Sequence, residues 1–139
     1  MIEALAIAAA LLTVQAPPTG REITLEELGT WKNKSDSVHV QIKPCGEETV
    51  CGVVVWASDK AKRDAAKGGT ENLVGTQILR RFREKEGLVW KGKAYVADIG
   101  KEFTGTIEPL DYNTMKVKGC VAGGLICKTQ IWTRVRRNS

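Results

Sequence analysis

Short stretches in which apolar and polar residues alternate recur along most of this 139-residue chain. The clearest covers residues 37–43, where Val38, Val40 and Ile42 are apolar and the residues between them are polar. Because successive side chains of a strand point to opposite faces, this pattern predicts a β-strand with one buried face. His39 falls on the polar face, where we expect a solvated residue rather than a catalyst.

Six further segments carry strand signals, and turns separate them about every eight to twelve residues. They cover residues 50–56, 73–83, 88–96, 102–108, 114–119 and 128–135. The segment 73–83 also fits a helix, but a strand is favoured because residues 88–96 provide a hairpin partner. Residues 58–68 predict a short polar helical loop. The chain is therefore predicted to be all-β, an antiparallel barrel or sandwich of about seven to eight short strands.

The two ends of the predicted sheet favour a barrel. Gly29 and Trp31 precede the first predicted strand, and Arg134 lies on the last one. The first and last strands of a closed barrel are neighbours, so the Arg134 guanidinium could stack on the Trp31 indole, an interaction worth about 0.5–2 kcal/mol. The sequence does not decide which residues of the last strand point inward, because a shift of one residue exchanges positions 130, 132 and 134 for 131, 133 and 135.

The N-terminus has the pattern of a secretory signal peptide. Residues 4–14 form an uncharged run rich in Ala, Leu and Ile, and a small-x-small sequence and two prolines follow it. This run is too short to span a bilayer. A basic n-region is missing, since Glu3 stands there, and the alternative is a buried N-terminal helix. We expect a signal peptide over residues 1–16, a linker and short helix over 17–28, and a single β-barrel domain over 29–137.

Export bears on the state of the four cysteines. In an oxidising compartment they imply two disulfides, for which three connectivities exist. The local pairs Cys45 with Cys51 and Cys120 with Cys127 are favoured, because each pair flanks a Gly-containing loop between strand-like segments. Such short loops give about 2 kcal/mol each. The alternative is a zinc site, but these spacings are longer than the usual C-x2-4-C.

A wider set of motifs resembles a known family. The Gly-x-Trp of residues 29–31 with the late Arg134 is similar to the lipocalin and calycin signature. The whole succession resembles the bacterial exported family known as domain of unknown function 2147, on these residues: 29–31, 42–46, 50–56, 73–75, 78–79, 90–95, 100–103 and 128–134. The resemblance implies a lipocalin-like barrel in the cell envelope of a Gram-negative bacterium, and no established reaction. Many members have Tyr-Asp-Pro where this chain has residues 95–98.

Two kinds of function suit such a barrel. A barrel of about eight strands can hold one small ligand, here an apolar or lipid-like molecule, in its interior. The candidate ligand-binding residues are Trp31, Trp56, Trp90, Tyr95 and Arg134. Alternatively these aromatic residues fill the core, and the protein is a periplasmic interaction or structural protein that uses its surface. Residues 80–83 or the loop 120–127 would then be exposed.

Other functions find little support in the sequence. No nucleophile motif, phosphate loop or metal-ligand cluster occurs, so we expect no enzyme, no cofactor and no metal site. The formal charge is +5, and removal of Glu3 with the signal peptide would raise it by one unit. Because the basic residues are spread along an exported chain, an anionic membrane surface is a more natural partner than nucleic acid. The expected location is exported and periplasmic.

Overall fold

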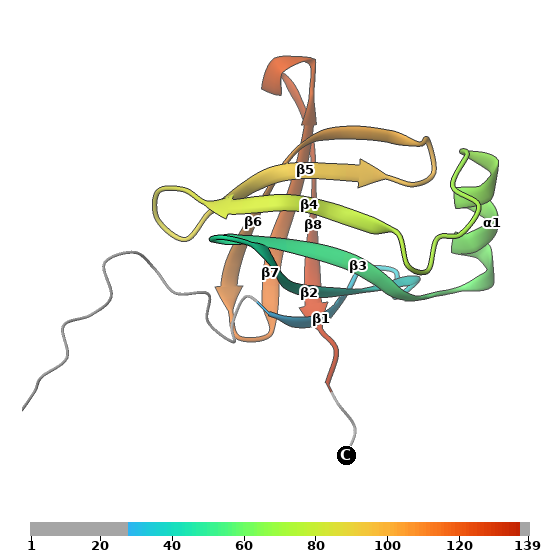
Figure 1. Ribbon diagram of the computed structural model, residues 1–139, viewed down its shortest axis with the longest axis horizontal. Helices are drawn as coiled ribbons and strands as arrows, with labels where there is room; N and C mark the ends of the chain where they lie inside the picture. The colour runs from blue at the N-terminus through green and yellow to red at the C-terminus, as the bar shows by residue number, and fades with distance from the viewer. Residues whose placement is uncertain (1–27, 137–139) are drawn as a thin grey trace, which may run out of the picture.

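Residues 28–136 are described by a computed structural model, in which eight antiparallel strands close into a barrel (Figure 1). The expected signal peptide of residues 1–16 lies outside the described residues. The same holds for the expected linker and short helix over residues 17–28, of which only Leu28 is described.

Each strand pairs with the next one along the chain, and β8 pairs back with β1. The strands are β1 (Gly29–Lys32), β2 (Val38–Gly46), β3 (Thr49–Ala57), β4 (Gln77–Glu84), β5 (Trp90–Val96), β6 (Lys101–Asp111), β7 (Thr114–Val121) and β8 (Ile126–Arg134). Helix α1 (Asp59–Lys67) lies between β3 and β4, and a short 3-10 helix η1 (Ala122–Gly124) lies between β7 and β8. The predicted all-β antiparallel barrel is confirmed.

The predicted strands differ from the observed ones mainly at their ends. The strand β1 has only four residues, which is too few to show an alternating pattern, and the sequence did not predict it as a strand. The strand predicted over residues 73–83 begins at Gln77. Residues 73–76 form a turn instead, in which Gly75 has a φ of 97°.

Apolar side chains fill the barrel in two neighbouring clusters. The larger cluster contains Trp31, Val40, Ile42, Val50, Leu79, Phe82, Trp90, Ile107, Met115 and Trp132. The smaller cluster contains Val54, Ala57, Ala65 and Leu73, and it lies where α1 meets the barrel. Val38 and Ile78 are partly buried and pack against both clusters.

Both disulfides form within the predicted local pairs. Cys45 bonds to Cys51 at the β2–β3 hairpin, with Cα atoms 5.7 Å apart. Cys120 lies directly opposite Cys127 on β7 and β8, with Cα atoms 4.1 Å apart, and bonds to it. Two disulfides are typical of proteins outside the reducing cytoplasm.

Arg134 closes one end of the barrel. Its guanidinium carbon lies 4.4 Å from the ring centroid of Trp31 and 4.1 Å from that of Tyr112. Nη1 donates a hydrogen bond to the carbonyl of Leu28 at 2.7 Å, and Nε donates to the carbonyl of Tyr112 at 2.8 Å. A Cβ on Gly29 would lie 2.6 Å from Nη1, and the φ of Gly29 is 105°, so glycine is required there. The predicted stacking of Arg134 on Trp31 is confirmed.

We expect Arg134→Ala to lower the free energy of unfolding by about 2–3 kcal/mol, since it removes two ring contacts and two hydrogen bonds to backbone carbonyls. Urea denaturation of the oxidised protein measures this. Arg136→Ala is the matched control, because Arg136 is exposed two residues further along, and we expect a change within about 0.5 kcal/mol. Equal effects of the two variants would contradict the role given to Arg134.

Candidate functional site

The end of the barrel opposite Arg134 is open. The connections β1–β2, β3–β4 and β5–β6 meet there, because every second connection of an up-and-down barrel lies at the same end. A cleft of about 680 Å³ opens between them. This mouth cleft is lined by Asn33, Ser35, Asp36, Ser37, Val38, Val54, Ser58, Lys60, Ala61, Asp64, Leu73, Ile78, Tyr95, Val96, Ala97, Asp98, Gln130 and Trp132.

The floor of the mouth cleft is apolar. It joins Trp132 of the larger core cluster to Val54 and Leu73 of the smaller one. Val38 and Ile78 line the cleft between them and are only partly buried. The volume lies within the range of small-molecule sites, about 300–1,000 Å³, which are mostly apolar with a few polar groups. The cleft can therefore hold an apolar group of moderate size.

Helix α1 forms one wall of the cleft. The Ser58 hydroxyl accepts a hydrogen bond from the backbone N–H of Ala61 at 3.1 Å, which caps the helix N-terminus. At the other end, Gly68 packs so closely on the β5–β6 turn that a Cβ would lie 1.8 Å from the carbonyl oxygen of Asp98. Only glycine allows this approach, which fixes the helix against the turn.

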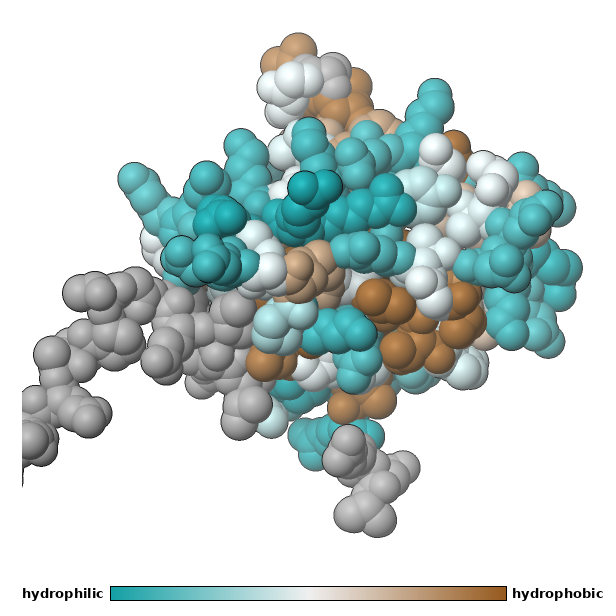
Figure 2. Space-filling view, viewed as in Figure 1, coloured by the Kyte–Doolittle hydropathy of each residue, from teal (hydrophilic) through white to brown (hydrophobic). Residues whose placement is uncertain are grey.

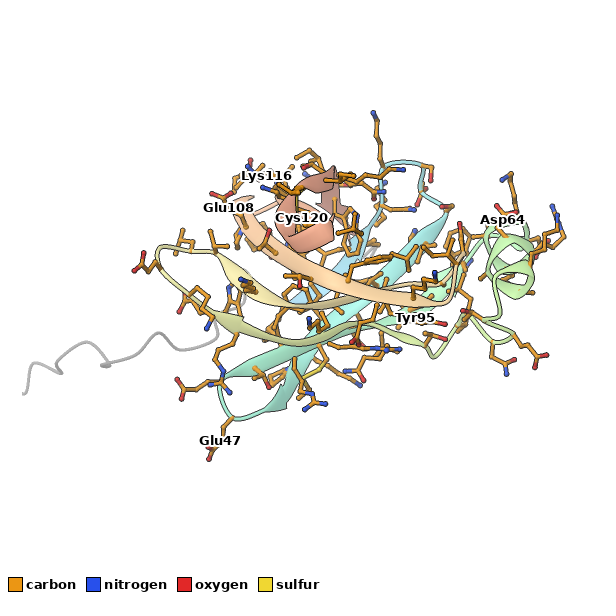
Figure 3. The ribbon with its side chains drawn as sticks, turned by 90° about the horizontal axis from the view of Figure 1, so that it is seen from above. Glu47, Asp64, Tyr95, Glu108, Lys116 and Cys120 are labelled. Atoms are coloured by element: carbon orange, nitrogen blue, oxygen red, sulfur yellow. A yellow bond between two sulfur atoms is a disulfide. The ribbon has the colours of Figure 1, made fainter. Side chains whose placement is uncertain are left out.

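Tyr95 ties the same wall to the barrel. Figure 3 shows it on the side of the barrel that faces α1. The buried Thr70 hydroxyl donates to the carbonyl of Ala97 at 2.9 Å. Its oxygen therefore accepts from the Tyr95 hydroxyl, 2.7 Å away. The guanidinium of Arg80 lies over the Tyr95 ring at 4.4 Å.

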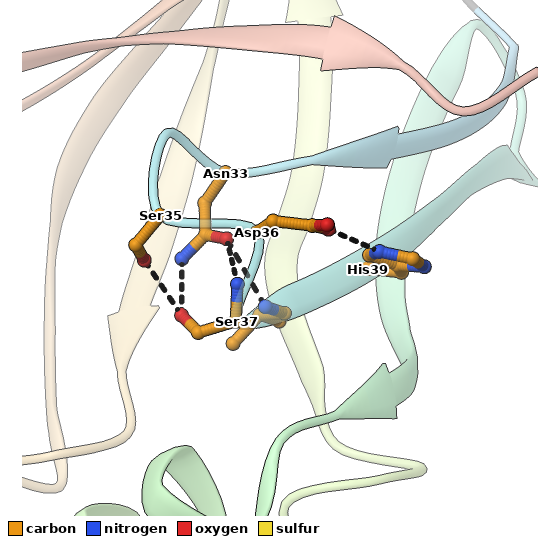
Figure 4. A network of polar contacts seen from close by, with 6 residues as sticks. Asn33, Ser35, Asp36, Ser37 and His39 are labelled. Carbon is orange, nitrogen blue, oxygen red and sulfur yellow. Dashed lines mark hydrogen bonds and ion pairs between the residues drawn. The ribbon is translucent and has the colours of Figure 1, made fainter.

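The β1–β2 loop forms the rim across from the helix, and its polar groups satisfy one another (Figure 4). The side-chain oxygen of Asn33 accepts from the backbone N–H groups of Ser37 and Val38 at 2.9 and 3.0 Å. Asp36 has a left-handed φ of 53°, and its carboxylate accepts a hydrogen bond from His39 Nε2 at 2.7 Å. The loop is thus held by its own side chains.

Charge on the lining is mostly negative. His39 lowers the pKa of Asp36, chiefly through the hydrogen bond between them. Lys60 forms an ion pair with Asp64 at 2.8 Å, which lowers the pKa of Asp64 and raises that of Lys60. Lys60 is the one cation among the lining residues, and Asp98 adds a further carboxylate. The lining residues in the described part of the chain therefore present no unpaired cation to a bound molecule.

Of the five residues predicted to bind a ligand, Tyr95 alone lines the mouth cleft. Trp31 and Trp90 lie in the larger core cluster, and their indole N–H groups have no acceptor within the described part of the chain. Packing rather than hydrogen bonding therefore places these two rings. Arg134 lies at the closed end, where it holds the rings of Trp31 and Tyr112.

The expectation that Trp56 points inward is wrong. Strict alternation from Val54 would place Trp56 inside, but a β-bulge lies between them. His39 pairs with Trp56 and the next residue, Val40, pairs with Val54, so Val55 is an extra residue on β3. Trp56 is consequently 45% exposed, with its ring centroid 4.6 Å from that of His39.

Trp132 is the main cleft residue that the candidate set omitted. Its indole Nε1 donates to Gln130 Oε1 at 2.9 Å, so both residues of β8 face the mouth. Residues 130 and 132 thus face the same side of the strand, which is one of the two alternatives that the sequence left undecided for β8. Val38, Val54 and Ile78 belong to apolar faces of predicted strands, but no local signal separates cleft residues from core residues.

Metal binding and membrane crossing by a helix find no support in residues 28–136. Groups of three or more His, Cys, Asp or Glu side chains arranged to hold a metal ion do not occur among these residues. Nor does any helix in this range have the length and apolar character needed to cross a membrane.

Comparison with known proteins identifies a family and a fold. A family model described as "Uncharacterized protein conserved in bacteria (DUF2147)" matches residues 29–134. Among solved structures, the chain is similar to protein HP1028 from Helicobacter pylori, described as belonging to the lipocalin family. The TM-score is 0.63 at 17% identity, over 81% of this chain and 85% of that one. No curated protein matches the chain. The structural similarity shows a lipocalin-like fold.

The Asp36–His39 pair generates a pH prediction. Replacing His39 by Ala removes the hydrogen bond that is the strongest cause of the lowered pKa, so the pKa of Asp36 should rise toward its ordinary value of 3.8. In the native protein the folded-state pKa lies below the unfolded one. The pair therefore stabilises the loop above the unfolded pKa, and this contribution is lost as the pH falls through the folded pKa.

NMR titration of the side-chain carboxyl signals measures this shift. Asp111 serves as an internal control, because hydrogen bonds from Thr114 and Asn113 lower its pKa independently of His39. We expect Asp36 to move and Asp111 to stay. An unchanged midpoint for Asp36 would show that His39 does not hold this carboxylate in solution.

Proposed function

The chain belongs to the bacterial family DUF2147, and on the geometry of its mouth cleft we propose that it is a non-catalytic binding protein. The ligand is a small apolar or lipid-like molecule that enters the open end of the barrel. The observation that carries this proposal is the partly open cleft whose floor is formed by Val54, Ile78 and Trp132. Covering apolar surface of this kind with a ligand stabilises the complex by about 25 cal/mol per Å² of apolar surface removed from water.

The charge of the lining narrows the ligand class. Its single cation, Lys60, is paired with Asp64, whereas Asp36 and Asp98 add negative charge near the rim. A carboxylate or phosphate headgroup inside the cleft would meet like charge, and the described lining residues offer it no unpaired cation. The polar end of the ligand is therefore neutral or positively charged.

The alternative function is that of an interaction protein that uses its surface and has a filled core. The half of the barrel next to Arg134 supports this alternative. There Trp31, Phe82 and Met115 are fully buried and leave that half packed. The mouth cleft lies outside this filled region, and it favours ligand binding over a purely structural role. Only the mouth end then accepts a ligand, so the ligand is modest in size.

The proposed location is the periplasm of a Gram-negative bacterium. The signal-peptide pattern of residues 1–16 supports export. The two local disulfides support an oxidising compartment. We infer that the barrel domain of residues 29–137 works there without a cofactor.

Filling the cleft should weaken ligand binding. N-phenyl-1-naphthylamine, a neutral apolar dye whose fluorescence rises in apolar sites, is the probe. We expect Ile78→Trp to weaken its binding by about tenfold or more, because the larger ring occupies the apolar floor. Leu88→Trp is the matched control, since Leu88 is 50% exposed in the β4–β5 turn at the opposite end. Equal binding by both variants and the parent would refute the cleft as the binding site.

Displacement of the dye tests the charge argument. Dodecylammonium and dodecanoate share one alkyl chain and differ in headgroup charge. We expect dodecylammonium to displace the dye at the lower concentration, and Asp36→Asn with Asp98→Asn to reduce the difference. A preference for dodecanoate that survives in Ile78→Trp would place the anion at another surface.

The location is tested by intact mass. Protein purified from the periplasm of an expressing Gram-negative host should begin at Pro17 and weigh two hydrogens less per disulfide than the reduced chain. Retention of residues 1–16 on a folded cytoplasmic protein would disprove the proposed export, without bearing on the cleft.

A further inference from the structure

The β7–β8 hairpin extends beyond the barrel and ends in exposed apolar side chains. Leu125 is 86% exposed and Ile126 is 62% exposed. We call these two residues the apolar tip. Figure 1 shows the hairpin rising clear of the other strands, and Figure 2 shows its end as a brown projection above a largely teal surface. Residues 126–131 of β8 are all exposed, so the described part of the barrel leaves this strand of the hairpin uncovered.

A disulfide fixes the base of the apolar tip. Cys120 and Cys127 face each other across the hairpin immediately before the turn. Gly123 and Gly124 have φ values of 68° and 95°, which allow a tight reversal. The cross-link limits the turn to the few residues between the cysteines and holds the two strands together at its base.

Cations surround the shaft of the hairpin below the tip. Lys118 pairs with Thr129, and Lys128 pairs with Gly119. Because alternate residues of a strand face opposite ways, Lys118 and Lys128 lie on opposite faces of the hairpin. Lys128 follows Ile126 by two residues, a distance of about 7 Å along a strand. Apolar side chains of peripheral membrane proteins reach about 5–10 Å into the headgroup boundary, which matches this spacing.

More cations continue onto the neighbouring strands. One row of paired residues runs across the sheet from Arg80 to Lys93, Thr104, Cys120 and Cys127. Arg80 and Lys93 thus place like charges directly opposite each other, and such a pair destabilises a sheet. Lys93 contacts Thr104 Oγ1 at 3.4 Å.

Few carboxylates offset this charge. Glu102 pairs with Arg80 at 3.2 Å. Among the residues that the structure describes, Lys93, Lys118 and Lys128 have no ion-pair partner. The apolar tip therefore stands next to cations that can take an external anionic partner.

We propose that the hairpin docks the protein on an anionic lipid bilayer. Leu125 and Ile126 enter the headgroup boundary, while Lys93, Lys118 and Lys128 contact lipid phosphates. A bilayer is favoured over a protein groove because cations occupy both faces of the shaft, which suits a surface that surrounds the hairpin. The proposal is independent of ligand binding in the mouth cleft, since none of these five residues lines it.

Vesicle co-sedimentation of the protein purified after export tests the docking. Vesicles of phosphatidylethanolamine with phosphatidylglycerol are compared with vesicles of phosphatidylethanolamine with phosphatidylcholine. We expect binding to the anionic vesicles alone, weakening as salt is raised. Leu125→Asn with Ile126→Asn should reduce the partition coefficient by about tenfold or more, and so should Lys118→Gln with Lys128→Gln.

Matched controls come from the opposite end of the barrel. Leu88→Asn with Leu110→Asn removes two leucines that are each 50% exposed, and Lys43→Gln with Lys85→Gln removes two exposed lysines. We expect both control pairs to bind vesicles like the parent protein. Unchanged circular dichroism would show that all variants are folded.

Two results would overturn the proposal. One is failure of the parent protein to bind anionic vesicles at low salt. The other is full vesicle binding by both the tip variant and the lysine variant. The exposed tip would then be a contact for a protein rather than for a bilayer. Binding of N-phenyl-1-naphthylamine by the same samples separates this outcome from failure of the cleft.

Discussion

Closure of the sheet through the β1–β8 pair is the constraint on which the rest of the molecule depends. The pair is short, with Trp31 opposite Arg134 and Lys32 opposite Thr133. Arg134 reinforces it by joining two aromatic rings and two backbone carbonyls at one end. Without this junction both strands would be unpaired edges, which favour association with other chains. Closure also fixes which connections share an end, and so creates an open mouth opposite a sealed base.

The division into a packed base and an open mouth decides what the barrel can hold. A chain of 139 residues has little apolar material to spare, and large side chains such as Phe82 and Met115 are fully buried in the base. At the mouth, α1 and the β5–β6 turn stand apart from β8, and a cleft opens over Trp132. Close packing of Gly68 on Asp98 keeps that wall in place. The same small size that requires a filled base confines a ligand to the mouth.

The two proposed activities lie on chemically different surfaces. The mouth cleft has paired or negative groups around an apolar floor, whereas the hairpin has lysines without an ion-pair partner in residues 28–136 below an apolar tip. A single molecule can thus accept a neutral or cationic small molecule at one place and an anionic surface at another. The two surfaces are also separate in space, since the β7–β8 hairpin projects away from α1 and no residue of its turn lines the cleft (Figure 1).

Much of this fold follows from the sequence alone, because local rules govern it. Period-two alternation around Val40, turn residues and Cys spacing depend on neighbours along the chain, so they determine the strands and local disulfides. Other features depend on contacts between distant segments. The bulge that turns Trp56 outward, the face of β8 that carries Trp132, and the separation of core from cleft arise only when register and closure are set. The sequence alone determined an antiparallel barrel with two local disulfides. The tertiary structure decided which aromatic side chains fill the barrel, which face solvent and which line the mouth.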